Sequence, residues 1–229
     1  MNKNILAFDT VSSSFSIAIQ KSENPEIISE YNKENVRNHN EELLPILHSF
    51  LEENKLSLND INYIALGIGP GSFTALRIAF ATIKTICYAR NIPIIGISSL
   101  DTLYENIREY KGIKASIIDA RKGSIYANIY NNDEKIKENL DLTYEEFVNI
   151  IKSIETSNKD ITLCGDGFVR NYEFFKENLK DYNLPILDNY YHIIRASNTI
   201  KLSRGKEFDD IFTLLPLYIR KSEAEYKKI

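Results

Sequence analysis

The chain has 229 residues, of which 43% are hydrophobic and 26% are charged, a composition typical of globular proteins and not of disordered or fibrous ones. Its 28 Lys and Arg residues nearly balance its 32 Asp and Glu residues. The resulting net charge of −4 excludes a protein that binds nucleic acid through bulk positive charge. At about 150 residues per domain, the length predicts one large domain or two small ones.

The cysteines and the apolar segments indicate a cytoplasmic protein. Cys87 and Cys164 are too few for a disulfide framework and lie in apolar stretches, so we expect buried thiols in a reducing compartment. Asp9 interrupts the apolar run that a signal peptide needs. No apolar stretch reaches the roughly 18 residues of a membrane-spanning helix.

Strand and helix patterns alternate along the first hundred residues. Three short strand-like segments are separated by Ser, Asn and Pro residues typical of turns, which predicts an antiparallel meander. Apolar residues at helical spacing then alternate with buried strands, giving the order β-β-β-α-β-α-β. The expected elements are strands 5–10, 15–20, 26–32, 61–68 and 92–97 and helices 40–54 and 74–90.

The second half contains similar ingredients. Thr143 with Glu146 forms a capping box typical of a helix start, and Gly205 is expected to end a helix that Ser197 caps. RKG at 121–123 predicts a hairpin turn. The expected elements are strands 114–120, 124–131, 134–139 and 161–165 and helices 99–110, 143–154, 168–179 and 197–204.

A glycine-rich turn, GPGSFT, lies between a predicted strand and the helix 74–90. Such a turn can present free backbone N–H groups to an anion, although it lacks the lysine of a Walker P-loop. The alternative is a tight strand-to-helix turn in which Gly69 and Gly71 set the backbone dihedrals. In that case a hydroxyl group of Ser72 or Thr74 caps the helix. The shape of the motif favours the second interpretation.

Asp9 and Thr10 end the first predicted strand, and a serine-rich turn that includes Ser12 follows them. A carboxylate at a strand end beside hydroxyl groups could hold Mg²⁺ and a phosphate tail. Phosphate-binding hairpins usually carry glycines, and none lies between Asp9 and Phe15. Asp9 therefore either caps the turn or belongs to a vestigial nucleotide loop, and active phosphate transfer is the less favoured interpretation.

The histidines and cysteines argue against metal or covalent catalysis. His39 and His48 are nine residues apart and His192 stands alone, so no pair has the i, i+4 spacing of a helical zinc site. Neither cysteine lies in the polar, electropositive surroundings of a reactive thiol. The sequence therefore predicts no metal site and no catalytic residue.

Both helices of the first half carry apolar stripes that are wider than one sheet contact requires. The stripes cover arcs of about 160° on helix 40–54 and about 200° on helix 74–90, at 100° per residue. Either another part of the chain or another protein must cover the excess, and burial by a partner is the favoured interpretation. The predicted interface residues are Leu43, Leu47, Phe50, Ala75, Leu76, Ala79, Phe80 and Ile83.

Six segments along nearly the whole chain resemble one protein family. GPGSFT followed by LRI, after a β-β-β-α-β pattern, is the most specific of the shared motifs. The chain is similar to the TsaB family, also called YeaZ, the dimerisation subunit of the bacterial tRNA threonylcarbamoyladenosine machinery. The similar segments are 5–19, 39–45, 67–86, 92–103, 119–126 and 216–220.

The resemblance implies an α/β fold with two RNase H-like lobes of the actin, Hsp70 and sugar-kinase type, in which helices flank mixed sheets and the second lobe is reduced. We expect lobes over 1–103 and 104–210 and a tail over 211–229. The resemblance also implies a non-catalytic scaffold that pairs with the homologous catalytic subunit TsaD and with the ATPase TsaE. Such a scaffold meets tRNA only through the complex. Its pairing surface matches helices 40–54 and 74–90, which also allow a homodimer.

The chain departs from the family pattern at Ala75 and Ala79, where the family usually has glycine. Alanine favours the helix by about 0.8–1 kcal/mol per site but adds methyl groups to the surface that the resemblance places in the helix pairing. Asp119 and 165–167 occupy places resembling a second phosphate loop and an adenosine loop, and we assign them no function. The resemblance implies no resident cofactor, with a nucleotide only at the subunit junction.

Two other functions remain open at this point. The first is an autonomous ATP-binding enzyme of the same superfamily that places Asp9 on Mg²⁺. The second is a glycopeptidase, which requires a metal-binding pair that this sequence lacks.

Overall fold

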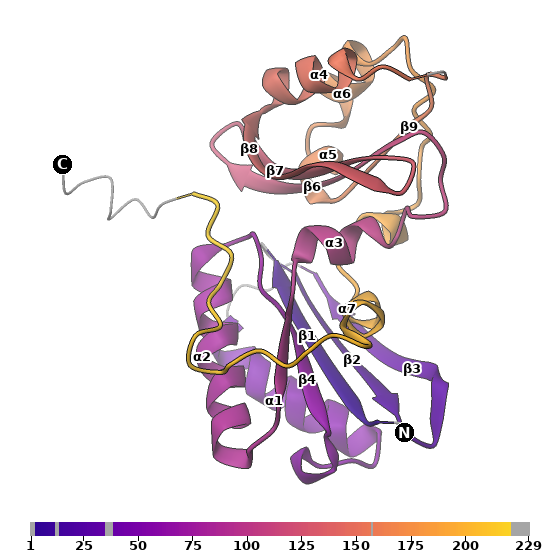
Figure 1. The fold of residues 1–229 in the computed structure, drawn as a ribbon. Coiled ribbons are helices and arrows are strands. Elements are labelled where there is room, and N and C mark those ends of the chain that lie inside the picture. Colours follow the sequence, from indigo (N-terminus) through magenta and orange to yellow (C-terminus); the bar gives the residue numbers. More distant parts are fainter. Residues whose placement is uncertain (1–2, 12–13, 35–38, 157, 221–229) are drawn as a thin grey trace, which may run out of the picture. The chain divides into compact units, whose positions relative to one another are not determined.

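The structure is a computed structural model that describes residues 3–11, 14–34, 39–156 and 158–220. It divides into two compact units, Met1–Thr102 with Ile194–Leu217 and Leu103–Ile193 with Tyr218–Ile229. This division differs from the expected lobes 1–103 and 104–210. The reason is that α7 (Ala196–Ser203) packs on the sheet of the first unit, against β1, β2, β4 and β5 (Figure 1).

The first unit contains a five-stranded mixed sheet in the order β3-β2-β1-β4-β5. The predicted meander is confirmed, because β1, β2 and β3 pair antiparallel, whereas β4 and β5 run parallel to β1. The strands are β1 (Ile5–Val11), β2 (Ser14–Lys21), β3 (Asn24–Lys33), β4 (Tyr63–Gly67) and β5 (Ile94–Ile97). The helices are α1 (His39–Glu53), the short η1 (Leu58–Asp60), α2 (Phe73–Arg90) and α7.

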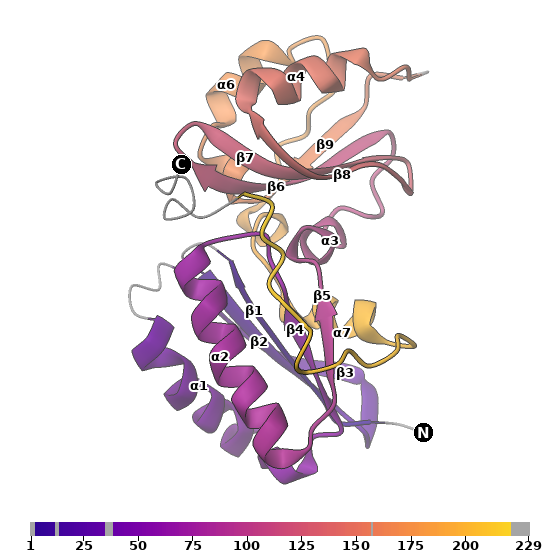
Figure 2. The ribbon, with the colours of Figure 1, turned by 60° about the vertical axis from the view of Figure 1, so that its left-hand side comes forward.

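Alternating side chains along β1 explain why helices cover both faces of this sheet. Leu6 and Phe8 belong to the core that the sheet forms with α1 and α2. Ile5 and Ala7 belong to the core on the other face, which includes Ile200 of α7. Figure 2 shows α1 and α2 next to each other on one face of the sheet, with α7 on the opposite face.

The chain that follows α7 runs back over the first unit. The Asp209 N–H donates to the Ile94 carbonyl at 2.9 Å, and the Leu217 N–H donates to the Ile68 carbonyl at 2.7 Å. Lys84 of α2 donates to the Leu214 carbonyl at 2.8 Å. Segment 209–217 therefore lies against β5 and one side of α2.

The second unit contains a four-stranded mixed sheet in the order β8-β7-β6-β9. Its pairing repeats that of the first four strands of the first unit, with β6, β7 and β8 antiparallel and β9 parallel to β6. The described residues of this unit contain no fifth strand, as a reduced second lobe requires. Its elements are β6 (Ile113–Arg121), β7 (Ser124–Asn131), β8 (Glu134–Thr143), α4 (Tyr144–Ser153), β9 (Ile161–Cys164), α5 (Asp166–Val169), α6 (Tyr172–Asn178) and η2 (Asn189–Tyr191).

The capping box at Thr143 is confirmed, and the other predicted helix boundaries of the second half differ from the structure. Helix α3 (Ser99–Tyr104) ends before the expected Tyr110, because Asn106 turns its side chain to the carbonyls of Tyr191 and Ile193. The expected helix 168–179 is divided into α5 and α6, since Asn171 has a non-helical backbone and its side chain donates to the Gly167 carbonyl.

Helix α7 begins at Ala196, and Ser197 is not its cap. The first free N–H groups of α7 bind to side chains of the sheet instead. The Ala196 N–H donates to Ser16 Oγ and the Ser197 N–H donates to Glu30 Oε1, both at 2.7 Å. No helix among the described residues is both long enough and apolar enough to cross a membrane.

Candidate functional site

Asp9 lies near the end of β1, at the edge where the parallel strands β4 and β5 also end. Its side chain is fully buried. Ser99 Oγ donates to the carboxyl group of Asp9, at 2.9 Å from Oδ1 and 3.0 Å from Oδ2. Ser99 Oγ in turn accepts a hydrogen bond from the Gly69 N–H at 3.2 Å. The carboxyl group is thus held by one hydroxyl group that is itself held by the glycine-rich turn.

Burial dominates the protonation of this carboxyl group. It raises the pKa of Asp9 from 3.8 to about 7, against the smaller lowering effect of the Ser99 hydrogen bond on that pKa. No ion pair of Asp9 occurs among the described residues. Asp9 therefore holds a proton in the folded chain over a range of pH in which an exposed aspartate is ionised.

Gly67 of β4 provides the space for this arrangement. A Cβ atom at Gly67 would lie 2.2 Å from Cγ of Asp9, which is closer than real Cβ contacts occur. Neither Gly67 nor Ser99 was predicted from the sequence to be a partner of Asp9. A glycine inside an otherwise apolar strand is a recognised sign of close approach by another group, and it could have indicated Gly67.

Thr10 and Ser12, the other residues of the predicted nucleotide loop, provide no exposed ligand group among the described residues. Thr10 is also buried, and its hydroxyl group has no hydrogen-bond partner in the described part of the chain. Ser12 lies outside the described residues. A buried carboxyl group whose two oxygens share one hydroxyl proton has no surface on which to bind Mg²⁺ in this conformation.

The GPGS segment forms a tight turn between β4 and α2, which is the interpretation that the sequence motif favours. Gly69 has φ +94°, and a Cβ there would lie 2.8 Å from the Leu76 side chain, so glycine is required at this position. Ser72 occupies the N-cap position of α2, but its side chain makes no capping hydrogen bond. Gly71 is half-buried, and Thr74 is exposed in the first turn of α2.

The eight predicted interface residues are all buried inside the chain. None exceeds the 7% exposed fraction of Phe50. The expectation that the chain leaves this stripe uncovered is therefore wrong. Both helices pack on the sheet and contact each other, and Ile211 and Leu214 of segment 209–217 join the same core. The buried residues are Leu43, Leu47, Phe50, Ala75, Leu76, Ala79, Phe80 and Ile83.

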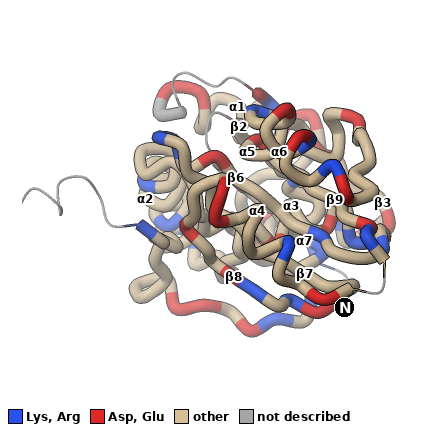
Figure 3. The backbone as a smooth tube through the Cα atoms, turned by 90° about the horizontal axis from the view of Figure 1, so that it is seen from above, with Lys and Arg blue, Asp and Glu red and all other residues tan. Residues whose placement is uncertain are grey.

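A different set of residues faces outward from these helices, and we call it the α1–α2 outer surface. On α1, Leu44 is 53% exposed and Pro45 is also exposed. On α2, Ala81 and Thr85 are exposed and Ile78 is half-buried. Helix α1 carries four Glu residues and no Lys or Arg, whereas α2 carries Lys and Arg but no acidic residue (Figure 3).

In the second unit, the residues that resemble nucleotide loops are engaged with one another. Asp166 Oδ1 accepts from the Asp119 N–H at 3.0 Å, and Asp119 Oδ1 accepts from the Arg121 N–H at 2.9 Å. Gly165 has φ +108°, and a Cβ there would lie 2.0 Å from the Ile117 carbonyl oxygen. These contacts stabilise the connections of β6 and β9.

The described residues contain no group of three or more His, Cys, Asp and Glu side chains that could hold a metal ion. Burial raises the pKa of Cys87 to about 12 and also raises the pKa of Cys164, so neither thiol is ionised near neutral pH. Burial lowers the pKa of His192, against the opposing effect of the Leu187 carbonyl on that pKa.

Two units that repeat one strand pairing, the first with a carboxyl group near the end of its first strand, define a protein of the actin-like ATPase fold. YeaZ from Pseudomonas aeruginosa has a TM-score of 0.70 and 23% identity, over 94% of this chain and 99% of that chain. A protein with an actin-like ATPase fold and unknown function from Bacteroides thetaiotaomicron has a TM-score of 0.50 and 13% identity, over 87% and 95% of the two chains.

Sequence comparison gives the family. The family model described as TsaD, tRNA N6-adenosine threonylcarbamoyltransferase, matches residues 26–227. The tRNA threonylcarbamoyladenosine biosynthesis protein TsaB of Bacillus subtilis is 29% identical over 229 residues, covering 98% of this chain and 97% of its own. TsaB of Buchnera aphidicola subsp. Baizongia pistaciae is 30% identical over 228 residues, covering 96% and 99%. The chain belongs to the TsaB (YeaZ) family of tRNA threonylcarbamoyladenosine biosynthesis proteins, which confirms the resemblance inferred from its motifs.

Proposed function

We propose that this chain is a non-catalytic scaffold subunit of tRNA threonylcarbamoyladenosine biosynthesis, pairing with the homologous catalytic subunit TsaD and working with the ATPase TsaE. The observation that carries the proposal is the closed pair of Asp9 and Ser99. The alternative, an ATP-using enzyme that places Asp9 on Mg²⁺, needs this carboxylate to be ionised and accessible to the metal ion. Here that carboxyl group is buried, and burial raises its pKa to about 7.

The α1–α2 outer surface is the pairing surface in this proposal. Ala81 and Thr85 are small, exposed and uncharged, so a partner helix can approach the α2 backbone closely. Leu44 adds a large exposed apolar side chain on α1. The acidic residues of α1 and the basic residues of α2 give the rim a charge pattern that a specific partner can match.

Co-expression with TsaD tests the pairing. Ala81→Glu and Thr85→Glu each place a charge on the surface, and we expect the amount of TsaD that co-purifies to fall at least about tenfold. Thr213→Glu is the matched control, because Thr213 is an exposed threonine of the same unit outside α1 and α2. Undiminished co-purification with both helix variants, at unchanged melting temperature, would reject this surface.

Titration calorimetry separates the scaffold from the alternative of an autonomous ATP-using enzyme. We expect the isolated chain to give no binding heat with Mg-ATP, because Asp9 is closed to the metal ion. Micromolar binding that Asp9→Asn abolishes would instead support the enzyme and contradict the scaffold.

A further inference from the structure

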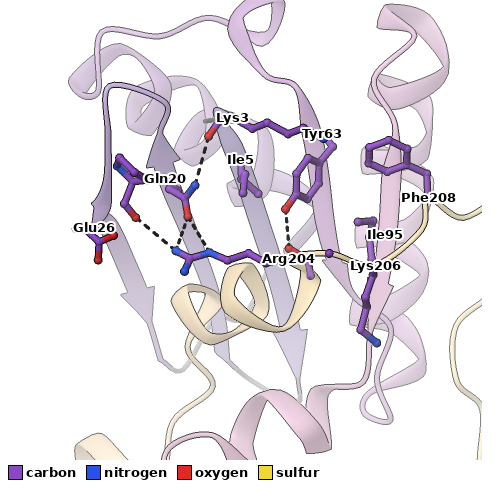
Figure 4. Close-up of a pocket in the computed structure, with 12 residues that line it drawn as sticks. Lys3, Ile5, Gln20, Glu26, Tyr63, Ile95, Arg204, Lys206 and Phe208 are labelled. Atoms are coloured by element: carbon purple, nitrogen blue, oxygen red, sulfur yellow. Dashed lines mark hydrogen bonds between the residues drawn. The ribbon is translucent and has the colours of Figure 1, made fainter. Parts of the chain in front are cut away.

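A cavity of about 490 Å³ opens on the first unit (Figure 4). It lies where β1 begins, and Asp9 lies near the other end of that strand. The residues that line its deep part, Ile5, Tyr63 and Ile95, come from the beginnings of β1, β4 and β5 and are buried. Helix α7 ends at Ser203 and so covers only part of this face of the sheet. The volume is in the range of pockets that bind small molecules, roughly 300–1,000 Å³.

The charge on the cavity wall is mainly positive. Lys3, Arg204 and Lys206 line it, and Glu26 is the one acidic lining residue. No carboxylate pairs with Lys3 or Arg204 within the described part of the chain. In a protein with a net charge of −4, unneutralised cations around a cavity favour an anionic ligand.

Arg204 is held in place by a buried side chain. Gln20 is only 5% exposed, and its Oε1 accepts hydrogen bonds from Nε of Arg204 at 3.1 Å and from Nη2 at 2.5 Å. Nη2 also donates to the Pro25 carbonyl at 3.4 Å. These acceptors are neutral and do not balance the positive charge of the guanidinium, and none of these bonds uses Nη1. A guanidinium fixed in this way is preorganised for a phosphate oxygen.

Two aromatic rings lie beside one of these cations, Lys3. The Nζ atom of Lys3 lies 5.5 Å from the ring centroid of Tyr63 and 5.3 Å from that of Phe208. Figure 4 shows the Lys3 side chain running toward Tyr63, while Arg204 extends toward Gln20 with Ile5 between the two cations. Phe208 is 48% exposed, and its ring centroid lies 5.7 Å from that of Tyr63, so the rest of its surface is available for stacking with a flat ligand group.

We propose that this cavity binds a nucleotide, with its phosphate group on Arg204 and its base stacked on Phe208 beside Lys3. A free nucleotide and an exposed nucleotide of an RNA strand offer the same chemistry. The cavity lies on the α7 face of the sheet, whereas the α1–α2 outer surface lies on the other face. The two proposed surfaces share no residue, so each can be altered by substitution without changing the other.

Titration of the full chain with AMP tests the site. Wild-type protein should bind AMP more weakly as salt increases, and adenosine, which lacks the phosphate group, should bind about tenfold more weakly than AMP. Arg204→Gln should raise the Kd for AMP about tenfold by removing the charge, and Phe208→Ala should raise it at least about fivefold by removing the stacking ring. Lys201→Gln is the control, since Lys201 is an exposed cation of α7 that does not line the cavity.

A hexameric oligoadenylate distinguishes the two sources of the nucleotide. Binding that is much tighter than the sum of six AMP sites, with the same dependence on Arg204, assigns the site to an RNA strand, and equal affinity per nucleotide assigns it to a free nucleotide. The absence of binding of both probes at about 5 mM would overturn the proposal. So would an equal loss in the Lys201→Gln control, or unchanged affinity in a folded Arg204→Gln variant. The Arg204→Gln and Phe208→Ala variants should co-purify with TsaD as well as the wild type does, so failure of this proposal is distinguishable from failure of the proposed pairing.

Discussion

The hydroxyl group of Ser99 donates its one proton to both carboxyl oxygens of Asp9, and Ser99 Oγ lies 2.9 Å from Oδ1 and 3.0 Å from Oδ2. The backbones of Ser99 and Gly69 are also bonded, because the Ser99 N–H donates to the Gly69 carbonyl at 2.8 Å. The end of β1, the turn after β4 and the start of α3 therefore meet at one buried polar group. The carboxyl group of Asp9 therefore connects three segments of the first unit.

The raised pKa of Asp9 predicts a specific pH dependence of stability. Between pH 3.8 and about 7 the folded chain keeps a proton that the unfolded chain has released. The contribution of Asp9 to the free energy of unfolding therefore falls as pH rises through this range and is constant above it. A shift of about three pKa units corresponds to about 4 kcal/mol.

Asp9→Asn should remove this dependence, because the amide group cannot ionise but keeps an oxygen that accepts from Ser99. Urea unfolding should show similar stabilities for wild type and Asp9→Asn at pH 4 and a more stable variant at pH 8. Asp181→Asn, at an exposed position, should keep the wild-type profile. Parallel profiles for wild type and Asp9→Asn would show that Asp9 is ionised in the folded chain.

Gly67→Ala should destabilise the first unit by about 3 kcal/mol, since its new methyl group would lie 2.2 Å from Cγ of Asp9. The loss should be smaller in an Asp9→Ala background, where the space of the carboxyl group is free. A double-mutant cycle by urea denaturation measures this coupling. Additive effects of the two substitutions would mean that the two side chains do not compete for space.

Much of the fold could be predicted from local patterns. Alternating residues with Ser, Asn and Gly turns predicted the meanders β1–β3 and β6–β8, and helical spacing predicted α1 and α2 to within one residue at each end. These elements depend on neighbouring residues, which a sequence displays directly. The start of α7 could not be predicted in this way, because Ser16 and Glu30 cap it from about 170 residues away.

The same limit explains the wrong assignment of the interface residues. The arc of α2 was wide because segment 209–217, more than a hundred residues later, covers one of its sides. Helical spacing shows how much apolar surface a helix carries, but it does not show which distant segment covers it. For the same reason, the link between Asp9 and Ser99 was visible only in the structure.

Glu30 of β3 should be important for the attachment of α7. Its Oε1 accepts from the Ser197 N–H at 2.7 Å, and its Oε2 accepts from Arg195 Nε at 3.0 Å. Glu30→Ala leaves a helix N–H and a half-buried guanidinium without this partner, so we expect a loss of about 2–3 kcal/mol in urea unfolding. Glu23→Ala, at an exposed position of the same hairpin, should change stability by less than about 0.5 kcal/mol. Equal effects of the two variants would contradict this role.

Leu47 of α1 belongs to the folding core, and Leu44 of the same helix belongs to the proposed pairing surface. Leu47 is 3% exposed and belongs to the core under α1, so Leu47→Ala should cost about 2–5 kcal/mol of stability. Leu44 is 53% exposed, so Leu44→Ala should change stability by less than about 0.5 kcal/mol. Thermal melts of the two variants measure this difference, because both variants replace a leucine of the same helix by alanine.

For binding to TsaD, in contrast to stability, substitution of Leu44 should have a larger effect than substitution of Leu47. Leu44→Glu should leave the melting temperature of the isolated chain nearly unchanged and should reduce co-purification with TsaD, because it places a charge in the proposed apolar contact. Leu47→Ala should still bind TsaD at temperatures where it remains folded, since its side chain points into the core. If Leu44→Glu binds TsaD normally while Leu47→Ala loses binding without unfolding, the partner contacts the chain through rearranged helices. In that case the α1–α2 outer surface is not the pairing surface.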